Sequence, residues 1–385
     1  MENKREIRHK EAFDKWYENN KKGLIQAATG FGKSKVAINI LKEEVSNNKK
    51  LKVLLLSPTH SILENWKSEF EYWKFDYNKY KIDFQCYQSA YKFKDNHYNL
   101  VIADEIHNSL DNEYEAFFHN NTYDSILSLS AEVPKDKLFN LTKISPVVYN
   151  YSLNQGIEDG FIAPFDVYVI LHTLDDKNKY IQSGSKKVTF FTTELKQYKY
   201  LTSQIFAARF AKNVFYERKL LGDRMRLVYN LESKDNSCKI LIEELAKRGE
   251  FTLVFTELSK SLDRLTENGI HSNKSEEENN KIKQQFIENS INTIGSCKML
   301  KEGVTLSTVN NIILHSFNSK TLNFIQRIGR GLRYEENKKA KIFIYKTLNT
   351  VEEKWFENMI KSTNFNIKYL STSSVDFKKD LQNIL

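Results

Sequence analysis

Residues 27–34 of the chain combine the residue types that bind a phosphate. They read Ala-Ala-Thr-Gly-Phe-Gly-Lys-Ser and follow the apolar residues Leu24 and Ile25. In such a loop, glycines let backbone N–H groups turn toward a phosphate, Lys33 reaches the β- and γ-phosphates, and the Ser34 hydroxyl can ligate Mg²⁺. We therefore predict a nucleotide-binding loop with Lys33 as a catalytic residue and Ser34 as a metal ligand. The predicted nucleotide contacts here are Thr29, Gly30, Phe31, Gly32, Lys33, Ser34 and Lys35.

An adjacent acidic pair, Asp104 and Glu105, follows the apolar run Leu100–Ala103. Ligands of open parallel sheets bind outside the carboxyl ends of the strands, and adjacent carboxylates repel each other unless a cation compensates. We predict that Asp104 binds nucleotide-associated Mg²⁺ and that Glu105 polarises the attacking water. A solvated strand end is the simpler alternative, but the upstream phosphate loop favours an ATP- and Mg²⁺-dependent hydrolase.

An arginine-rich segment supplies a third candidate cluster. Gln326, Arg327, Arg330 and Arg333 recur at three- and four-residue spacing, so on a helix they share one face. Their charges repel unless an anion lies nearby, and a γ-phosphate would be such an anion. We predict Arg330 and Arg333 as catalytic arginine fingers, worth about 10³–10⁵ in rate, and Gln326 as a catalytic water-orienting residue. A solvated basic helix or a direct contact with a phosphate backbone is the alternative.

The elements that must position these clusters can be read from short apolar runs, which predict buried strands of parallel sheets covered by helices on both faces. The runs are Val53–Leu56, Leu100–Ala103, Ile126–Leu129, Leu253–Thr256, Ile312–His315 and Ile342–Tyr345. Helical spacing of apolar residues follows Lys33 and again follows Pro58. This alternation occurs twice, which predicts an α/β fold with two domains. We expect the first domain at residues 1–152, a joint at 153–165, the second domain at 166–365 and a C-terminal tail at 366–385.

The composition of the chain limits the kinds of partner and the cellular compartment that we expect. The chain has 385 residues and a formal net charge of +9, which favours a polyanionic partner without identifying it. No run approaches the roughly 18 apolar residues of a membrane helix, and residues 1–5 begin no signal sequence, so a cytoplasmic protein is expected. Cys86, Cys238 and Cys297 match no metal spacing and suit a reducing compartment.

In order and spacing, the clusters resemble the motifs of superfamily 2 helicases of the DExH branch, over roughly residues 5–350. Residues 27–34 look like motif I, 104–107 like motif II and 326–333 like motif VI. The remaining motifs resemble residues 58–60 (Ia), 127–131 (III), 254–259 (IV) and 300–304 (V). Residues 155–164 resemble the interdomain joint of helicases related to phage UvsW, XPB and restriction motor subunits.

This resemblance implies two tandem RecA-like domains with an ATP cleft between them. It places Gly303 and Thr305 at the nucleotide, although many relatives carry aspartate in place of Thr305. Glu132 likewise stands where the family usually has threonine, in the motif that couples hydrolysis to the second domain. The implied contacts to a nucleic-acid strand are Thr59, His60, Gln88, Ser89 and Thr256.

A basic and aromatic stretch between Lys186 and Arg226 is a less expected signal. It holds ten basic and three acidic residues, a difference of +7, with six aromatic residues interleaved from Tyr198 to Tyr216. We predict that Lys212, Arg218 and Lys219 contact the nucleic-acid backbone, with some base stacking by the aromatics. The alternative is a helix pair whose aromatics fill a core while its lysines face water.

Together these features predict an ATP-dependent helicase or translocase that moves on or remodels single-stranded, forked or branched DNA, as a monomer that a protein partner could assist. A phage setting in replication, recombination or repair, in the cytoplasm of a bacterial host, fits the joint and the Lys- and Asn-rich composition. A DExH RNA helicase and the motor subunit of a restriction or defence complex are the alternatives. A binding scaffold without catalysis is disfavoured because Lys33, Asp104, Glu105 and Arg330 are all present.

Overall fold

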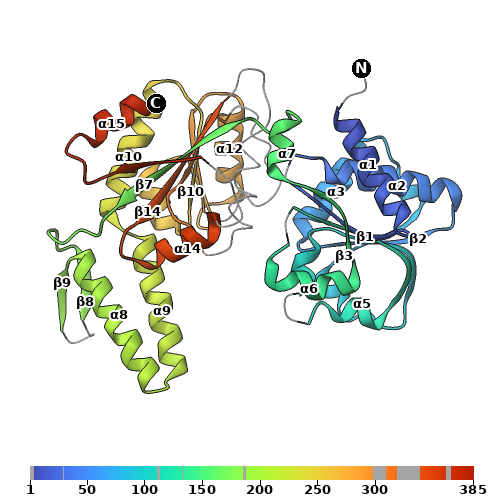
Figure 1. Ribbon diagram of the computed structural model, residues 1–385, viewed down its shortest axis with the longest axis horizontal. Coiled ribbons are helices and arrows are strands. Elements are labelled where there is room, and N and C mark those ends of the chain that lie inside the picture. Colours follow the sequence, from blue (N-terminus) through green and yellow to red (C-terminus); the bar gives the residue numbers. More distant parts are fainter. Residues whose placement is uncertain are drawn as a thin grey trace. The chain divides into compact units, whose positions relative to one another are not determined.

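The computed structural model describes residues 4–28, 30–110, 113–131, 133–184, 188–297, 309–318, 339–360 and 366–385. These residues form two compact units, and the chain passes from one to the other between Ala163 and Pro164. Each unit is built on a parallel sheet with flanking helices (Figure 1). The predicted α/β class is therefore confirmed.

In the first unit, six described strands form a parallel sheet in the order β3-β2-β4-β5-β1-β6. The strands are β1 (Lys22–Ala27), β2 (Lys52–Ser57), β3 (Lys81–Cys86), β4 (His97–Ala103), β5 (Thr122–Ser130) and β6 (Val147–Tyr151). The helices are α1 (Lys4–Glu18), α2 (Lys33–Asn47), α3 (His60–Tyr72), α4 (Tyr87–Ala90), α5 (Ala116–Asn120), α6 (Lys135–Ile144) and α7 (Leu153–Glu158). Because the strands are parallel, the carboxyl ends of β1, β4 and β5 meet at one edge of the sheet.

The second unit holds a parallel sheet that, in the part the structure describes, has the order β11-β12-β10-β13-β14-β7-β15. Its strands are β7 (Phe165–His172), β10 (Thr252–Thr256), β11 (Gly269–Ile270), β12 (Thr293–Cys297), β13 (Asn311–Leu314), β14 (Ala340–Thr347) and β15 (Ile367–Ser371). Its flanking helices are α10 (Glu232–Lys247), α11 (Ser259–Leu265), α12 (Glu276–Ile287), α14 (Val351–Ile360) and α15 (Phe377–Ile384).

The last residues of the chain belong to this second core. The stretch 366–385, which we expected as a tail, instead contributes β15, paired with β7, and α15. Phe377 and Leu381 lie one helical turn apart on α15 and are buried in the same cluster as Leu241 and Leu245 of α10. With this spacing, the apolar face of α15 covers the sheet, as that of α10 does. No helix among the described residues has the length and apolar character needed to cross a membrane.

An insertion between β7 and α10 departs from the sheet-and-helix pattern. It consists of the antiparallel strands β8 (Ile181–Gly184) and β9 (Thr189–Thr192), followed by α8 (Glu194–Phe210) and α9 (Val214–Tyr229). We call α8, α9 and the turn between them the helical hairpin. Figure 1 shows that it extends away from the parallel sheet of its own unit. Leu201, Ile205 and Ala208 of α8 pack against Leu220 of α9, so the hairpin has a small core of its own.

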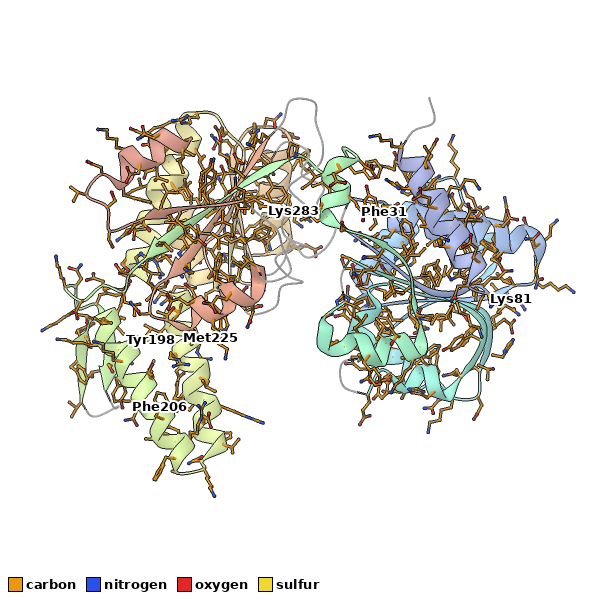
Figure 2. All side chains as sticks on the ribbon, in the orientation of Figure 1. Phe31, Lys81, Tyr198, Phe206, Met225 and Lys283 are labelled. Carbon is orange, nitrogen blue, oxygen red and sulfur yellow. The ribbon has the colours of Figure 1, made fainter. Side chains whose placement is uncertain are left out.

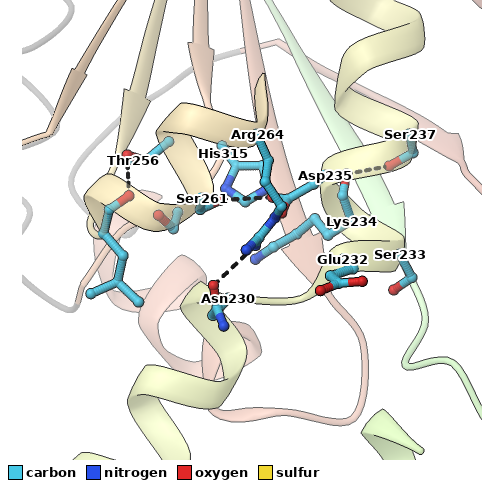
Figure 3. A network of polar contacts seen from close by, with 12 residues as sticks. Asn230, Glu232, Ser233, Lys234, Asp235, Ser237, Thr256, Ser261, Arg264 and His315 are labelled. Carbon is cyan, nitrogen blue, oxygen red and sulfur yellow. Dashed lines mark hydrogen bonds and ion pairs between the residues drawn. The ribbon is translucent and has the colours of Figure 1, made fainter. Parts of the chain in front are cut away.

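A polar network lies at the carboxyl edge of the second sheet (Figure 3). Asp235 accepts hydrogen bonds from the Ser261 hydroxyl (2.6 Å) and from Arg264 Nε (2.5 Å). Arg264 Nη2 also donates to Asn230 Oδ1 over 3.0 Å. Asn230 follows α9 directly, so the network joins α10, α11 and the base of the helical hairpin.

The fully buried ion pair between Lys234 and Glu352 lies beside this network. Lys234 Nζ is 3.0 Å from Glu352 Oε1, and Glu352 Oε2 accepts the Thr347 N–H over 2.8 Å. Both side chains have no exposed surface. Each charge is therefore compensated only inside the protein, which makes the pair sensitive to the loss of one partner.

We expect Lys234→Met to lower the free energy of unfolding by about 3–5 kcal/mol, because it leaves Glu352 as an uncompensated buried carboxylate. Urea denaturation of the full chain, followed by far-UV circular dichroism, measures the loss. The double variant Lys234→Met/Glu352→Gln removes both charges and keeps an acceptor for Thr347, so it should lose less than the single variant. A double variant that is less stable than Lys234→Met would contradict this account.

Candidate nucleotide site

The predicted phosphate loop connects β1 to α2. Gly30 (φ 91°) and Gly32 (φ 93°) both have left-handed backbone conformations, which residues with a Cβ adopt only at a cost. The loop can therefore turn tightly before α2 begins at Lys33. Lys33 Nζ donates to the carbonyl oxygen of Ala27 over 3.0 Å, so its side chain folds back across the loop. A phosphate could take the place of that carbonyl as the partner of the ammonium group.

Helix α1 holds the loop from outside through His9, which the sequence analysis did not identify. His9 Nε2 lies 2.6 Å from the carbonyl oxygen of Phe31. A carbonyl oxygen can only accept, so Nε2–H is the donor, and burial lowers the pKa of the His9 ring. A Cβ on Gly32 would come within 3.0 Å of the same ring. Gly32 is thus fixed both by its backbone angle and by the close approach of His9.

The first turn of α2 is bonded to α3. Ser34 Oγ donates to Glu69 Oε2 over 3.2 Å, and the same oxygen accepts the Trp73 indole N–H over 3.0 Å. Lys35 Nζ lies 3.6 Å from the centre of the Trp73 ring, and burial lowers the pKa of Lys35. In this structure Lys35 therefore contacts Trp73, although the sequence predicted it at the nucleotide. Sequence reasoning missed Glu69 and Trp73 as partners of the loop.

The acidic pair lies at the end of β4, on the same sheet edge. Asp104 Oδ2 accepts the Trp66 indole N–H over 2.8 Å, and Oδ1 accepts the Glu105 N–H over 3.0 Å. Burial, and then the neighbouring charge of Glu105, raise the pKa of Asp104 to about 6, although the charge of Lys33 lowers it. Glu105 itself has a left-handed backbone (φ 45°), which is strained for a residue with a side chain.

A second set of contacts joins Glu105 to the end of β5. Ser130 Oγ lies 3.5 Å from Glu105 Oε2 and 3.0 Å from His107 Nδ1, and His107 Nδ1 is also 3.5 Å from Glu105 Oε2. The region predicted as motif III therefore meets the region predicted as motif II through side chains.

The donor set of this edge fits Mg²⁺. Ser34 offers a hydroxyl and Asp104 a carboxylate that is poorly compensated by its surroundings, and hard divalent cations prefer oxygen ligands. The described residues contain no group of three or more His, Cys, Asp or Glu side chains arranged to hold a metal. Mg²⁺ in phosphate-transfer sites uses one or two protein groups together with phosphates and water, so the two residues suffice.

The candidate nucleic-acid contacts fall into separate groups. Thr59 caps α3 by accepting the Ile62 N–H (3.4 Å), and the Gln88 amide donates to the carbonyl oxygen of Pro58 (2.8 Å), which brings Thr59, His60, Gln88 and Ser89 to one region of the first unit. In the second unit Thr256 is fully buried and donates to the Leu258 carbonyl over 3.0 Å. The candidates on the helical hairpin, all exposed, are Lys212, Arg218 and Lys219.

The other predicted site residues lie outside the described part of the chain. They are Thr29, Gly303, Thr305, Gln326, Arg330 and Arg333.

Family models match both halves of the chain. Residues 3–135 match the model described as type III restriction enzyme, res subunit, and residues 234–335 match the helicase conserved C-terminal domain. Among curated proteins, the chain is similar to the DNA 3'-5' translocase XPB2 of Sulfurisphaera tokodaii. The two are 24% identical over 368 residues, which cover 89% of this chain and 81% of the relative.

Solved structures share the fold at low sequence identity. Dbp5 of S. cerevisiae, bound to RNA and ADP BeF3, has a TM-score of 0.61 at 13% identity, covering 98% of this chain and 93% of that one. The type ISP restriction-modification enzyme LlaBIII, bound to DNA, also scores 0.61 at 13% identity, covering 98% of this chain but 32% of that one. The Hef helicase domain of Pyrococcus furiosus scores 0.52 at 13% identity, covering 92% and 97%. These likenesses confirm two RecA-like folds in tandem.

The two family models follow one another in the order that the predicted motifs require. The first contains the phosphate loop and the acidic pair, and the second contains the arginine-rich segment. The chain belongs to the superfamily 2 helicases and is an ATP-hydrolysing enzyme of that family.

Proposed function

We propose that this protein is a DNA translocase that couples Mg²⁺-dependent ATP hydrolysis to movement along, or remodelling of, single-stranded, forked or branched DNA. The observation that carries the proposal is the joint placement of the phosphate loop, Asp104 and Glu105 at one sheet edge, with Ser130 in contact with Glu105. The similarity to a DNA translocase over most of both chains supports DNA over RNA.

In this proposal each residue of the edge has a separate task. Lys33 exchanges the Ala27 carbonyl for a phosphate oxygen, and Ser34 and Asp104 hold Mg²⁺, which would neutralise charge on the phosphates. Trp66 fixes the orientation of Asp104 by its indole N–H. Glu105 accepts the proton of the attacking water, and its contacts with Ser130 and His107 set the position of its carboxylate.

The proposal assigns the remaining roles to residues that the resemblance places at the site. Arg330 and Arg333 would stabilise the charge that develops on the transferred phosphoryl group, and Gln326 would orient water. Gly303 and Thr305 would contact the nucleotide. Hydrolysis would then be sensitive to any movement of the segment that carries the arginines, as a motor requires.

The DNA contacts in this proposal do not read sequence. Thr59, His60, Gln88 and Ser89 are small or polar groups suited to phosphates, and the basic helical hairpin adds Lys212, Arg218 and Lys219. We propose that the enzyme acts as a monomer in the cytoplasm.

Glu105→Gln should lower DNA-stimulated ATP turnover about 10²- to 10⁴-fold, because the water loses its proton acceptor. Lys33→Ala should lower it by about 10²-fold or more, because a cation aimed at the transferred phosphate is lost. Phosphate release measured with and without single-stranded DNA checks both. Glu43→Gln is the matched control: it makes the same chemical change at an exposed position of α2 and should leave turnover unchanged.

The same assay discriminates the alternatives. If wild-type turnover rises with RNA but not with single-stranded or forked DNA, the protein is an RNA helicase and the assignment as a DNA translocase is wrong. Equal turnover in wild type and Glu105→Gln would show that Glu105 is not a catalytic residue of ATP hydrolysis.

The double variant Arg218→Glu/Lys219→Glu should flatten the salt dependence of DNA binding. Each lost phosphate contact reduces the slope of log K against log salt concentration by about 0.7 for single strands, so two contacts give a decrease of about 1.4. Titrations by fluorescence anisotropy at several salt concentrations measure the slope. Lys281→Glu/Lys354→Glu makes the same charge change at exposed positions of α12 and α14 and should leave the slope closer to wild type. Equal slopes in both double variants would show that no specific contact exists.

A further inference from the structure

The turn of the helical hairpin exposes aromatic side chains that its core does not use. Phe210 at the end of α8 is 93% exposed and Phe215 at the start of α9 is 84% exposed. Phe206, one turn before Phe210, is 63% exposed and is labelled on the hairpin in Figure 2. Large apolar groups gathered in this way mark an interaction surface more often than isolated ones do. Aromatic filling of a helical core, the alternative raised from the sequence, therefore does not account for these three residues.

The charge around these side chains is positive. Residues 188–229 hold eight basic and three acidic residues, a difference of +5. Two of the acids are paired locally, Glu217 with Arg209 and Asp223 with Arg226. The third, Glu194, is buried at the far end of α8, where it accepts the Ser233 hydroxyl. Within the described part of the chain, Lys212 in the turn and Arg218 and Lys219 in the first two turns of α9 form no ion pair. A partner with negative charge and flat apolar groups complements this surface, and unpaired nucleic acid offers both.

Lys212 occupies a backbone position that glycine fits better. Its φ is 54°, in the left-handed region, and it is the second residue after the end of α8. Asn213 N donates to the Ala208 carbonyl over 2.9 Å and Lys212 N to the Arg209 carbonyl over 3.0 Å, the hydrogen-bond pattern of a helix terminus where glycine is preferred. The side chain of Lys212 thus adds charge between Phe210 and Phe215 at a position where it does not favour the fold.

The hairpin is tied at its base to the second sheet. Glu194, the first residue of α8, is fully buried and accepts from the Ser233 hydroxyl at 2.7 Å. Asn230, directly after α9, accepts from Arg264, which Asp235 holds in place (Figure 3). Both ends of the hairpin are therefore bonded to α10 or α11 of the unit that carries it.

We propose that the turn of the helical hairpin is a binding site for unpaired bases, in which Phe206, Phe210 and Phe215 stack on bases and Lys212 binds the adjacent phosphate. This inference rests on the proposed function and deepens it by naming the substrate class. Paired bases present their faces only at the ends of a duplex, whereas unpaired bases are open to stacking. The site therefore selects DNA that has a single-stranded segment, alone or at a fork or branch, over blunt duplex.

The test uses the full chain without ATP and three probes: oligo-dT of about 20 nucleotides, longer than the roughly 4–16 that one single-strand-binding fold covers, a forked duplex and a blunt duplex. Phe210→Ala/Phe215→Ala should raise the Kd for oligo-dT and for the fork by about fivefold or more per lost stacking contact. The Kd for blunt duplex should stay unchanged. Phe139→Ala, which removes an exposed aromatic from α6 of the first unit, is the matched control and should change none of the three.

Lys212→Gly tests the phosphate contact without a folding penalty, because glycine suits the left-handed backbone at this residue. The salt slope of oligo-dT binding should fall by about 0.7, the value for one phosphate contact on a single strand, while the midpoint of thermal unfolding stays equal or rises. An unchanged slope would overturn the assignment of Lys212.

Two results would overturn the base-binding site. One is that, for each of the three probes, Phe210→Ala/Phe215→Ala has the same Kd as wild type. The other is self-association of wild type in sedimentation velocity that the double variant abolishes while DNA binding is unchanged, which would make the turn a protein interface. DNA-stimulated ATP turnover of wild type distinguishes failure of the proposed function from failure of this inference. If wild type shows no such stimulation, the proposed function is wrong. If it does, but the double variant binds DNA as wild type does, only the base-binding site is wrong.

Discussion

The burial of Asp104 beside a second carboxylate, Glu105, is the constraint on which the candidate site depends. Burial, and then the neighbouring charge of Glu105, disfavour the ionised form and raise the pKa of Asp104 to about 6. The fold accommodates the pair by directing different donors to each member. Trp66 from α3 bonds Asp104, while Ser130 from β5 lies beside Glu105. The remaining imbalance favours a cation at this edge of the sheet.

The places of the phosphate loop and the acidic pair in the fold could be predicted from the sequence because the pattern that marks each of them is local. The phosphate loop and the acidic pair are each contiguous, and the runs that deliver them are apolar on both faces. β2, β4, β5, β10, β13 and β14 all lie where such runs predicted strands. Strands without that pattern, such as β3 and β12, were not predicted. β3 reads Lys-Ile-Asp-Phe-Gln-Cys and lies at the edge of its sheet, and β12 is buried with small residues, Thr-Ile-Gly-Ser-Cys.

The partners of the site could not be predicted from the sequence in the same way. Trp66 has helical spacing with Phe70, which indicates a core position, and both are in fact buried. Nothing in that spacing shows that the indole N–H of Trp66 faces Asp104, 38 residues away. The same is true of His9, which reaches the Phe31 carbonyl from α1, and of Glu69, which accepts from Ser34. These contacts depend on the packing angle of helices, and spacing along one helix does not determine it.

The helical hairpin shows what composition leaves open. Aromatic residues along α8 could have formed its inner face, but the buried stripe follows Tyr198, Leu201, Ile205 and Ala208, at intervals of three and four. Phe206 falls beside this stripe rather than on it, and the phenylalanines of the turn lie beyond the packed core of the hairpin. The number of hydrophobic residues in this segment is therefore larger than the number that its core contains.

The carboxyl edge of the second sheet carries a different kind of polar cluster from that of the first. Its members bond one another: Asp235 binds Ser261 and Arg264, and Lys234 binds Glu352. Well-packed apolar residues would often be at least as stable as a buried ion pair, so stability alone does not explain the cluster. Directional bonds from Arg264 to both Asp235 and Asn230 do something that apolar packing does less well: they fix the end of α9 at a defined orientation to α11. A defined orientation of the helical hairpin, rather than additional stability, is therefore what these bonds contribute.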